Sequence, residues 1–167
     1  RAAPWAAEGA ARYRHYGLEM SLFSGKTRAY LRHKGLPFDD LTVRLWTAPG
    51  LVRKAGALVL PVLRTPEGEW LQDTAHIIDT LEARHPQGPV LPTTPRQRVA
   101  ASLLEAWGDE CWLPSAMHYR WNYNEDWAYQ EFGAISAPDR PAPEQYEIGK
   151  RNGERLKSAL PPLGVSP

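Results

Sequence analysis

The sequence predicts an α/β unit that is followed by an all-helical unit. In the first half of the chain, patterns typical of strands and helices come in the order strand, helix, strand, strand, strand, helix. Pro86, Pro89, Pro92 and Pro95 then punctuate ten residues and mark a stiff linker. Beyond residue 95, apolar residues recur only at helical spacing. We therefore expect a small mixed sheet with helices packed on it, then a linker, then helices and loops.

The composition gives no sign of several classes of partner. With 167 residues, 43% of them hydrophobic, the chain can fill the core of one domain or of two small ones. Twenty Lys and Arg against nineteen Asp and Glu leave a net charge of +1, which does not point to nucleic acid or an anionic membrane. No apolar run approaches the roughly 20 residues that span a bilayer, and residues 1–5 lack the apolar stretch of a signal peptide. Cys111 is the single cysteine, which fits a reducing compartment, so we expect a soluble, cytoplasmic protein.

The first elements follow an N-terminal stretch without a clear pattern. Residues 1–15 are rich in alanine and are interpreted as an N-terminal extension. Apolar and more polar positions alternate over residues 17–23, which predicts a half-buried strand. A helix is expected over residues 26–34, ended by Gly35. A second alternating run, residues 41–45, predicts a strand parallel to the first through a right-handed crossover.

Residues 58–63 form the centre of the predicted sheet. This run is apolar and rich in branched residues, so it is expected to be a buried strand. Proline cannot donate to a strand ladder and is normally confined to edges, strand starts and bulges. A bend at Pro61 through a cis Leu60–Pro61 bond reconciles the two observations. The bend would leave the backbone groups of Leu60 free to pair with something other than the sheet.

A loose stretch over residues 46–56 precedes this strand, and a hairpin follows it. The turn at residues 65–69 leads to a strand at residues 70–72, and a helix is expected over residues 73–84. The proline-bent backbone and the N-terminus of that helix would then lie side by side. This arrangement predicts a peptide-binding groove.

The second half of the chain begins with a strong helix-start signal. Thr94 is suited to cap a helix whose first residue is Pro95. Four residues of one apolar face follow at four-residue spacing: Val99, Leu103, Trp107 and Cys111. This amphipathic helix is expected to bend or end at Pro114. Aromatic residues crowd positions 119–132, and a proline cluster then precedes a weaker helix with Ile148 on its apolar side.

Three stretches of the first unit carry a resemblance to a known family. They are Phe23-Ser24-Gly25-Lys26-Thr27-Arg28-Ala29-Tyr30-Leu31, Leu60-Pro61-Val62-Leu63 and Leu71-Gln72-Asp73-Thr74-Ala75-His76-Ile77-Ile78. With the linker that begins at Arg84-His85-Pro86, their order and spacing resemble the glutathione transferase family. The resemblance implies a thioredoxin-like N-terminal domain followed by a glutathione transferase-type helical domain.

On this interpretation residues 16–86 are the glutathione-binding domain, residues 87–95 the linker and residues 96–167 a partial all-helical C-terminal domain. The last is expected to be truncated, because the chain stops well short of the family's full helical domain. The resemblance also implies glutathione as the cosubstrate and a homodimer.

The family resemblance assigns glutathione contacts to four residues. Asp73 can accept from the ammonium of the γ-glutamyl end, while Thr74 and its backbone N–H at a helix N-terminus can hold the carboxylate. The alternative is that Asp73 or Thr74 only caps the helix. Next to Pro61, Leu60 would offer its N–H and C=O to the cysteinyl backbone, much as in strand addition.

Conjugation requires the thiolate of glutathione, because a free thiol is only a few per cent ionised at neutral pH. A hydroxyl donor at a helix N-terminus favours the charged form. Ser24 is the family-like candidate, and Ser21 is the alternative if the turn before the helix is shorter. An ordinary N-cap serine is the competing interpretation of Ser24. Lys26 or Arg28 could also support the negative charge of the sulfur.

Two further groups of residues are candidates for contacts with the glycine carboxylate of glutathione and with the electrophile. The lysine with which the family often meets the glycine carboxylate is missing here, and Arg53 or Lys54 is the candidate replacement. The electrophile is expected between the two domains, in an apolar pocket lined by four residues: Trp107, Cys111, Tyr119 and Trp121. Helix packing is an equal alternative for Trp107 and Cys111, and a cysteine on such a stripe is usually buried. No two histidines have a metal-ligand spacing with a suitable partner, so no metal is predicted.

The expected function is conjugation of glutathione to an apolar electrophile, and the sequence has features of two other functional classes. Gly25-Lys26-Thr27 resembles the end of a phosphate-binding loop, but the required first glycine is replaced by Met20. A stronger alternative is a non-catalytic protein of the same fold that binds glutathione or apolar ligands, or acts as an assembly module.

Overall fold

The computed structural model describes residues 11–165 apart from 45, 57, 58 and 159. The chain divides into two compact units, here called unit 1 (Arg1–Val90) and unit 2 (Leu91–Pro167). Each unit is described by itself.

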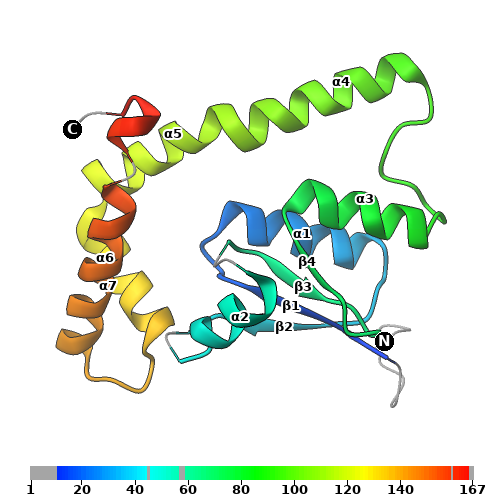
Figure 1. Ribbon diagram of the computed structural model, residues 1–167. Coiled ribbons are helices and arrows are strands. Elements are labelled where there is room, and N and C mark those ends of the chain that lie inside the picture. The colour runs from blue at the N-terminus through cyan, green and yellow to red at the C-terminus, as the bar shows by residue number, and fades with distance from the viewer. Residues whose placement is uncertain (1–10, 45, 57–58, 159, 166–167) are drawn as a thin grey trace, which may run out of the picture. The chain divides into compact units, whose positions relative to one another are not determined.

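Unit 1 is built on a four-stranded mixed sheet (Figure 1). Its strands are β1 (Tyr13–Gly17), β2 (Phe38–Thr42), β3 (Val62–Arg64) and β4 (Trp70–Gln72), in the order β2-β1-β3-β4. β1 is parallel to β2, whereas β3 is antiparallel to both β1 and β4. The mixed sheet and the parallel crossover between the first two strands confirm the sequence prediction.

Three helices accompany the sheet: α1 (Leu22–His33), α2 (Ala48–Ala55) and α3 (Thr74–Arg84). Figure 1 shows α1 and α3 side by side along one face of the sheet, and the two helices are in contact. The core lies where they meet the sheet, and its buried side chains are Tyr13, Tyr30, Leu31, Leu63, Leu71, Ile77, Ile78 and Leu81. α2 contacts β4 and is anchored by the buried Leu51.

The first strand lies earlier than the sequence predicts. The alternation over residues 17–23 is not a strand; β1 ends at Gly17, a turn follows, and α1 begins at Leu22. β1 alternates as well, with Tyr13, His15 and Gly17 buried, but a histidine in the core position hides the pattern. The strand therefore begins inside the stretch interpreted as an extension, of which residues 1–10 lie outside the described residues.

Other element bounds also differ from prediction. β2 begins at Phe38, three residues before the predicted start, and Leu45 lies outside the described residues. The stretch over residues 46–56, predicted to be loose, contains α2, which has proline in its first turn and Gly56 with a positive φ of 88° at its end. β3 covers only the end of the predicted run over residues 58–63, of which residue 58 is outside the described residues.

The hairpin and the helix after it agree with the sequence. Thr65 N–H donates to Glu69 O at 2.9 Å, which closes the predicted turn, and β4 has the predicted bounds. α3 ends at Arg84, as expected. Local turn and cap chemistry determines both elements, so the sequence alone locates them.

Unit 2 begins with a helix of four segments that runs through Pro114. The segments are α4 (Pro95–Ala106), the π-helical turn η1 (Trp107–Cys111), α5 (Trp112–His118) and a second π-helical turn η2 (Tyr119–Tyr123). Thr94 caps α4 as predicted, because its side chain accepts from Gln97 N–H. Of the two predicted alternatives at Pro114, an end of the helix is wrong, because α5 continues through the proline. The proline lies in the first turn of α5, directly after a π-helical turn, where the α-helical hydrogen-bond ladder is already interrupted.

Two antiparallel helices, α6 (Glu125–Ser136) and α7 (Ala142–Lys157), complete the packed part of unit 2, and a short 3₁₀ turn, η3 (Pro161–Leu163), follows. A Cβ added at Gly133 would lie 1.9 Å from Gln145 O, and one at Gly149 would lie 1.8 Å from Tyr129 O. These glycines therefore let the two backbones approach. The core of the unit consists of Trp121, Ala128, Tyr129 and Leu160.

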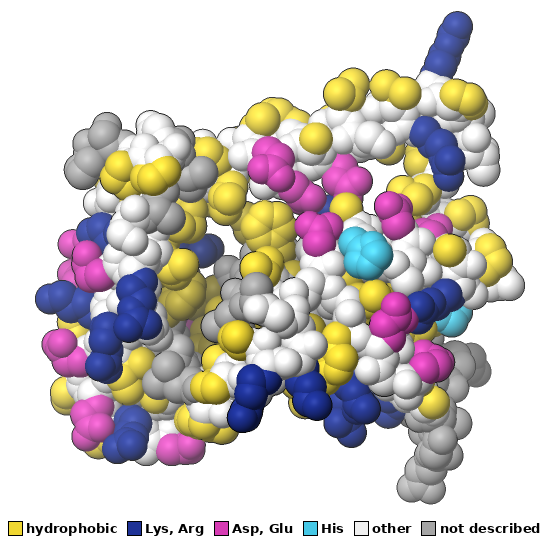
Figure 2. Space-filling view, viewed as in Figure 1, with side chains coloured by type: hydrophobic (Ala, Val, Ile, Leu, Met, Phe, Trp, Pro, Cys, Tyr) yellow, Lys and Arg dark blue, Asp and Glu magenta, His cyan; other side chains and the backbone are white. Residues whose placement is uncertain are grey.

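The apolar stripe that predicts α4 is exposed rather than buried. Val99 is 61% exposed, Leu103 66% and Trp107 53%, and Cys111 is also exposed. Figure 2 shows hydrophobic side chains along α4. The expectation of a buried cysteine is therefore wrong for this structure.

Candidate functional site

The strand register brings three separate parts of the sequence to one edge of the sheet in unit 1. Tyr16 of β1 pairs with Val62, so the end of β1 lies beside the start of β3. Val62 also pairs with Gln72, so the end of β4 lies beside the same point. Because α1 and α3 start just after β1 and β4, both helix N-termini lie at this edge. The predicted neighbourhood of proline-bent backbone and helix start is thus present.

Leu60 and Pro61 occupy the middle of this edge. The Leu60–Pro61 peptide bond is cis, as the sequence predicts, and Pro61 is fully buried. The backbone of Leu60 lies outside the strand ladder, which begins at Val62. The side chain of Gln72 donates to Val59 O at 3.1 Å and fixes the segment before the proline to the end of β4.

Asp73 occupies the turn between β4 and α3 in a rare backbone conformation. Its φ is 70°, and among the described residues no other non-glycine residue has a positive φ. Asp73 is the N-cap of α3, and its Oδ1 accepts from His76 N–H at 3.0 Å. The residue is exposed, whereas the side chain of Thr74 is buried. Thr74 can therefore contribute its first-turn backbone N–H at the surface more readily than its hydroxyl.

The two serines before and within α1 have different surroundings. Ser21 is the N-cap of α1 and is half-buried; its Oγ accepts from Ser24 N–H at 3.2 Å. Ser24 has no exposed surface, and its Oγ accepts from Leu18 N–H at 3.2 Å. The side chain of Ser24 is packed against Gly17, where an added Cβ would lie 2.7 Å from the Ser24 Oγ. Ser24 thus belongs to the interior of unit 1, and Ser21 to its edge.

The spacing of these groups suits a short extended peptide. Neighbouring strands lie about 4.8 Å apart, so the ends of β1 and β4, separated by β3, are about 10 Å apart. Three extended residues span about 10 Å. An extended peptide that begins at the start of α3 can therefore pass Leu60 with the side chain of its middle residue directed toward the start of α1. Both helix N-termini favour negative charge.

The last turn of α2 carries two exposed cations. Arg53 and Lys54, the sequence-based candidates for a peptide carboxylate, are both exposed there. The helix contacts β4, so it belongs to the same part of unit 1.

The four aromatic and cysteine candidates of unit 2 separate into two environments. Trp107, Cys111 and Tyr119 are exposed. Trp121 has no exposed surface. The centroid of its ring lies 5.2 Å from that of the Phe132 ring and 6.1 Å from that of the Tyr129 ring. Trp121 therefore fills the core of unit 2, in agreement with helix packing rather than ligand contact.

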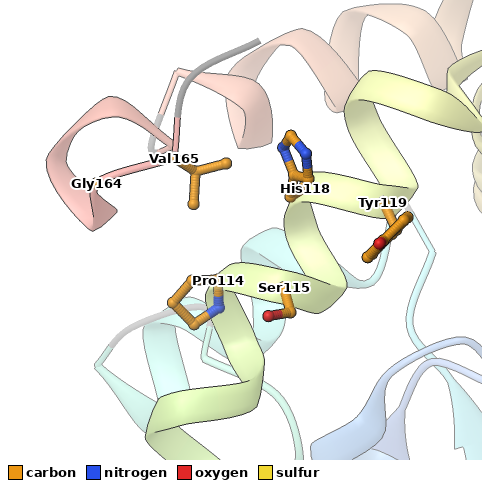
Figure 3. Close-up of a pocket in the computed structure, with 6 residues that line it drawn as sticks. All are labelled: Pro114, Ser115, His118, Tyr119, Gly164 and Val165. Atoms are coloured by element: carbon orange, nitrogen blue, oxygen red, sulfur yellow. The ribbon is translucent and has the colours of Figure 1, made fainter.

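Unit 2 also has an open cavity of about 440 Å³, shown in Figure 3. One wall is the helical stretch with Pro114, Ser115, His118 and Tyr119, and the other is the chain after η3. Of the predicted substrate residues, the cavity includes only Tyr119.

In the part of the chain that the structure describes, no cluster of three or more His, Cys, Asp or Glu side chains could hold a metal ion. None of the described helices has the length and apolar character needed to cross a membrane.

The sequence also contains a signal for the observed start of α1 at Ser21. Serine is a favoured N-cap residue, and its side chain ordinarily accepts from the backbone N–H two or three residues later. The prediction of a strand over residues 17–23 puts the helix start at residue 26 instead of residue 22, so Ser24 takes the place before the helix that Ser21 has in the structure.

A family model for the glutathione S-transferase N-terminal domain matches residues 20–84. No curated protein has a significant sequence match to the chain.

Several solved structures are similar. A glutathione S-transferase from Methylobacterium radiotolerans, in complex with glutathione sulfonate, is 28% identical with a TM-score of 0.57; the alignment covers 88% of this chain and 64% of that one. A glutathione S-transferase from Rhodospirillum rubrum is 22% identical with a TM-score of 0.59, over 86% of this chain and 62% of that one. The beta-etherase LigF from Sphingobium is 21% identical with a TM-score of 0.60, over 92% and 69% of the two chains. The present chain thus spans less than two thirds of the first two proteins.

Proposed function

We propose that this protein transfers the thiolate of glutathione to an electrophilic small molecule. Residues 20–84 match the N-terminal domain of the glutathione S-transferase family. The chain also has the family's fold, a thioredoxin-like domain followed by a helical region. The observation that carries the proposal is the sheet edge of unit 1. There, a cis-proline segment lies between two helix N-termini, one suited to the γ-glutamyl end and one to the thiol of a peptide bound at Leu60. The glutathione sulfonate in the Methylobacterium relative supports this ligand class.

The γ-glutamyl end of glutathione is assigned to the start of α3. Asp73 has an exposed carboxylate that suits the ammonium group, and the first backbone N–H groups of α3 suit the carboxylate. The unusual φ of Asp73 supports a functional role, because such conformations cost about 1–3 kcal/mol and cluster at ligand sites.

The cysteinyl part is assigned to Leu60 and Pro61, whose backbone lies between the two helix N-termini. Leu60 would exchange N–H and C=O hydrogen bonds with the peptide, as an added strand does. For the glycine carboxylate, Arg53 and Lys54 on α2 remain the candidates, because both are exposed cations.

For the thiolate we assign Ser21 in place of Ser24. A hydroxyl must reach the sulfur to donate to it, and the Ser24 side chain is enclosed. Ser21 lies at the sheet edge, at the positive end of α1, where hydrogen bonding and the helix dipole both lower a thiol pKa.

The electrophile is assigned to the exposed apolar residues Trp107, Cys111 and Tyr119 of unit 2, without Trp121, which is buried. The family resemblance extends the proposal to a homodimer in the cytoplasm. Light scattering with size-exclusion chromatography measures the oligomeric state.

The thiolate band of glutathione, followed by ultraviolet difference titration, tests the proposal. The wild-type protein is expected to lower the pKa of the bound thiol, and Ser21→Ala to return it toward the free value. A larger effect of Ser24→Ala than of Ser21→Ala would restore the Ser24 assignment. Binding of glutathione with an unchanged thiol pKa would favour a non-catalytic binding or assembly protein. Failure of the wild-type protein to bind glutathione would reject both functions.

A further inference from the structure

Arg28 is the centre of a polar network inside unit 1. Its side chain is only 9% exposed, and its Nε donates to Asp40 Oδ2 at 2.5 Å. Its Nη2 lies 3.2 Å from Glu19 Oε2. Asp40 Oδ1 accepts in turn from Nδ1 of the fully buried His15 at 2.8 Å. The network therefore joins α1, β1 and β2 to the turn before α1.

Arg28 supplies the positive charge of this network at neutral pH. Burial lowers the pKa of His15, so its imidazole is neutral and donates only through Nδ1. Burial raises the pKa of Asp40, but hydrogen bonds from His15 and Arg28 outweigh this effect and hold the pKa below its ordinary value. The Asp40 carboxylate thus relies on His15 and on the Arg28 guanidinium, which also pairs with Glu19.

The same guanidinium connects the sheet to the turn that carries Ser21. This β1–α1 turn comprises residues 18–21. Within it, Ser21 N–H donates to Leu18 O at 3.2 Å. The turn is also joined to α1, since Leu18 N–H donates to Ser24 Oγ and Ser21 Oγ accepts from Ser24 N–H, both at 3.2 Å. The Arg28–Glu19 ion pair adds a link from the turn to Asp40 on β2. The position of the Ser21 hydroxyl therefore depends on its contacts with α1 and on this link to the sheet.

We propose that Arg28 is a positioning residue for the thiolate site: by linking Glu19 to Asp40, it holds the β1–α1 turn where Ser21 can meet the sulfur of glutathione. The inference rests on the proposed function, because the role of Ser21 is itself proposed. It replaces the sequence-based idea that Arg28 supports the sulfur directly, since the guanidinium is engaged by two carboxylates.

Geometry rather than charge is the main contribution. Glu19 is 78% exposed, so solvent screens its charge and the ion pair itself is worth little. The planar guanidinium, however, offers donors in two fixed directions, which a lysine ammonium on a flexible stem does not reproduce. Arg28→Lys therefore keeps the positive charge but removes the brace, that is, the simultaneous link of residue 28 to Glu19 and Asp40.

Arg12 provides a matched control. Its Nε also donates to an aspartate of β2, Asp39 Oδ1, at 2.6 Å, and it lies at the opposite end of β1 from the turn. Arg12→Lys thus weakens a comparable link to β2 without touching residues 18–21.

The test measures the pKa of the bound glutathione thiol and the amide hydrogen exchange of Leu18 and Ser21 in the wild-type protein and both variants. Arg28→Lys is expected to raise the thiol pKa by about half to one unit, which is about a three- to tenfold loss of thiolate at fixed pH. Amide exchange in the turn is expected to accelerate, while Arg12→Lys changes neither quantity. Equal effects of the two variants on both quantities would overturn the inference.

Failure of the proposed function has a different signature. If wild-type protein does not bind glutathione or does not lower its thiol pKa, the function fails, and hydrogen exchange alone decides whether Arg28 braces the turn. If Arg28→Lys does not fold, Glu19→Ala removes the acceptor for Arg28 from the exposed side of the same link. Faster exchange at Leu18 and Ser21 in that variant supports the brace, and unchanged exchange contradicts it.

Discussion

His15 shows how a single buried polar residue links stability to pH. The side chain has no exposed surface, and burial lowers its pKa from 6.5. The unfolded chain therefore binds the proton more readily than the folded chain does. The stability that neutral His15 supports is present above the unfolded pKa and is lost as the pH falls below it.

The corresponding prediction concerns the free energy of unfolding between about pH 7.5 and about pH 5.5, on either side of the ordinary histidine pKa. Wild-type protein is expected to lose stability across this interval, and His15→Gln to show a smaller loss, because glutamine can donate to Asp40 without titrating. Urea unfolding at each pH measures the slopes, with His33→Gln at an exposed site as the control. The prediction fails if His15→Gln leaves the slope unchanged.

Asp73 allows helix capping to be separated from ligand binding. Asparagine caps helices as well as aspartate does and tolerates a positive φ, so Asp73→Asn should leave unfolding nearly unchanged. The variant lacks the charge that the ammonium of glutathione would meet, so we expect about a tenfold loss of affinity. Calorimetric titration with glutathione measures it. Unchanged affinity would mean that Asp73 is a cap and nothing more.

At the scale of elements, the contact between α6 and α7 depends on backbone proximity. Gly149→Ala would place a methyl group 1.8 Å from Tyr129 O, so the helices must separate. We expect a loss of about 3 kcal/mol or more in the stability of unit 2. Thermal unfolding followed by tryptophan fluorescence measures the change. Gly108→Ala is the control, because an added Cβ there has no neighbour within 4 Å. Equal effects of the two substitutions would contradict the packing argument.

Which elements the sequence predicts depends on whether local chemistry defines them. The hairpin, β4 and α3 follow from turn residues and a cap, and they lie where expected. The first strand was predicted too late in the chain because His15, a polar residue, occupies a core position. Asp40 on β2 accepts a hydrogen bond from the His15 ring, and no local sequence pattern reveals that partner. α2 was missed because Leu51 is its one buried residue. Tertiary contacts determine both β1 and α2, and such contacts cannot be inferred from a short stretch of sequence.

At the scale of the whole molecule, Lys34 fastens the start of the linker to unit 1. Its side chain is 2% exposed; Nζ lies 2.9 Å from Glu82 Oε1 and donates to His85 O at 2.6 Å and to Gln87 O at 2.8 Å. Tyr30 donates to the same carboxylate at 2.8 Å. A buried cation thus joins three parts of unit 1: the end of α1, α3 and the chain that follows α3.

Lys34→Met is therefore expected to destabilise unit 1 by about 3 kcal/mol or more, since it leaves the Glu82 carboxylate without its cation. Chemical denaturation measures this loss, and limited proteolysis is expected to show faster cleavage after His85. Lys54→Met, on the exposed end of α2, is the control and should change neither. Protection of the linker in Lys34→Met equal to that of the wild type would contradict the fastening role.

The positions of Leu60, Pro61, Asp73 and Thr74 in the fold were predictable, because they follow from turn and cap signals that lie close in sequence. Which serine lies at the start of α1 was not, since that required the correct end of β1. The role of Trp121 was not predictable either, because an aromatic residue in a helical run suits a core and a pocket equally well.

In the proposed complex, glutathione lies along one sheet edge of unit 1. Chemical-shift mapping of the labelled full chain with glutathione measures this placement residue by residue. We predict that the shifted backbone amides are those of residues 18–21, Val59 and Leu60, and residues 73–75, with Arg53 or Lys54. Shifts confined to unit 2, or none at millimolar glutathione, would contradict the account.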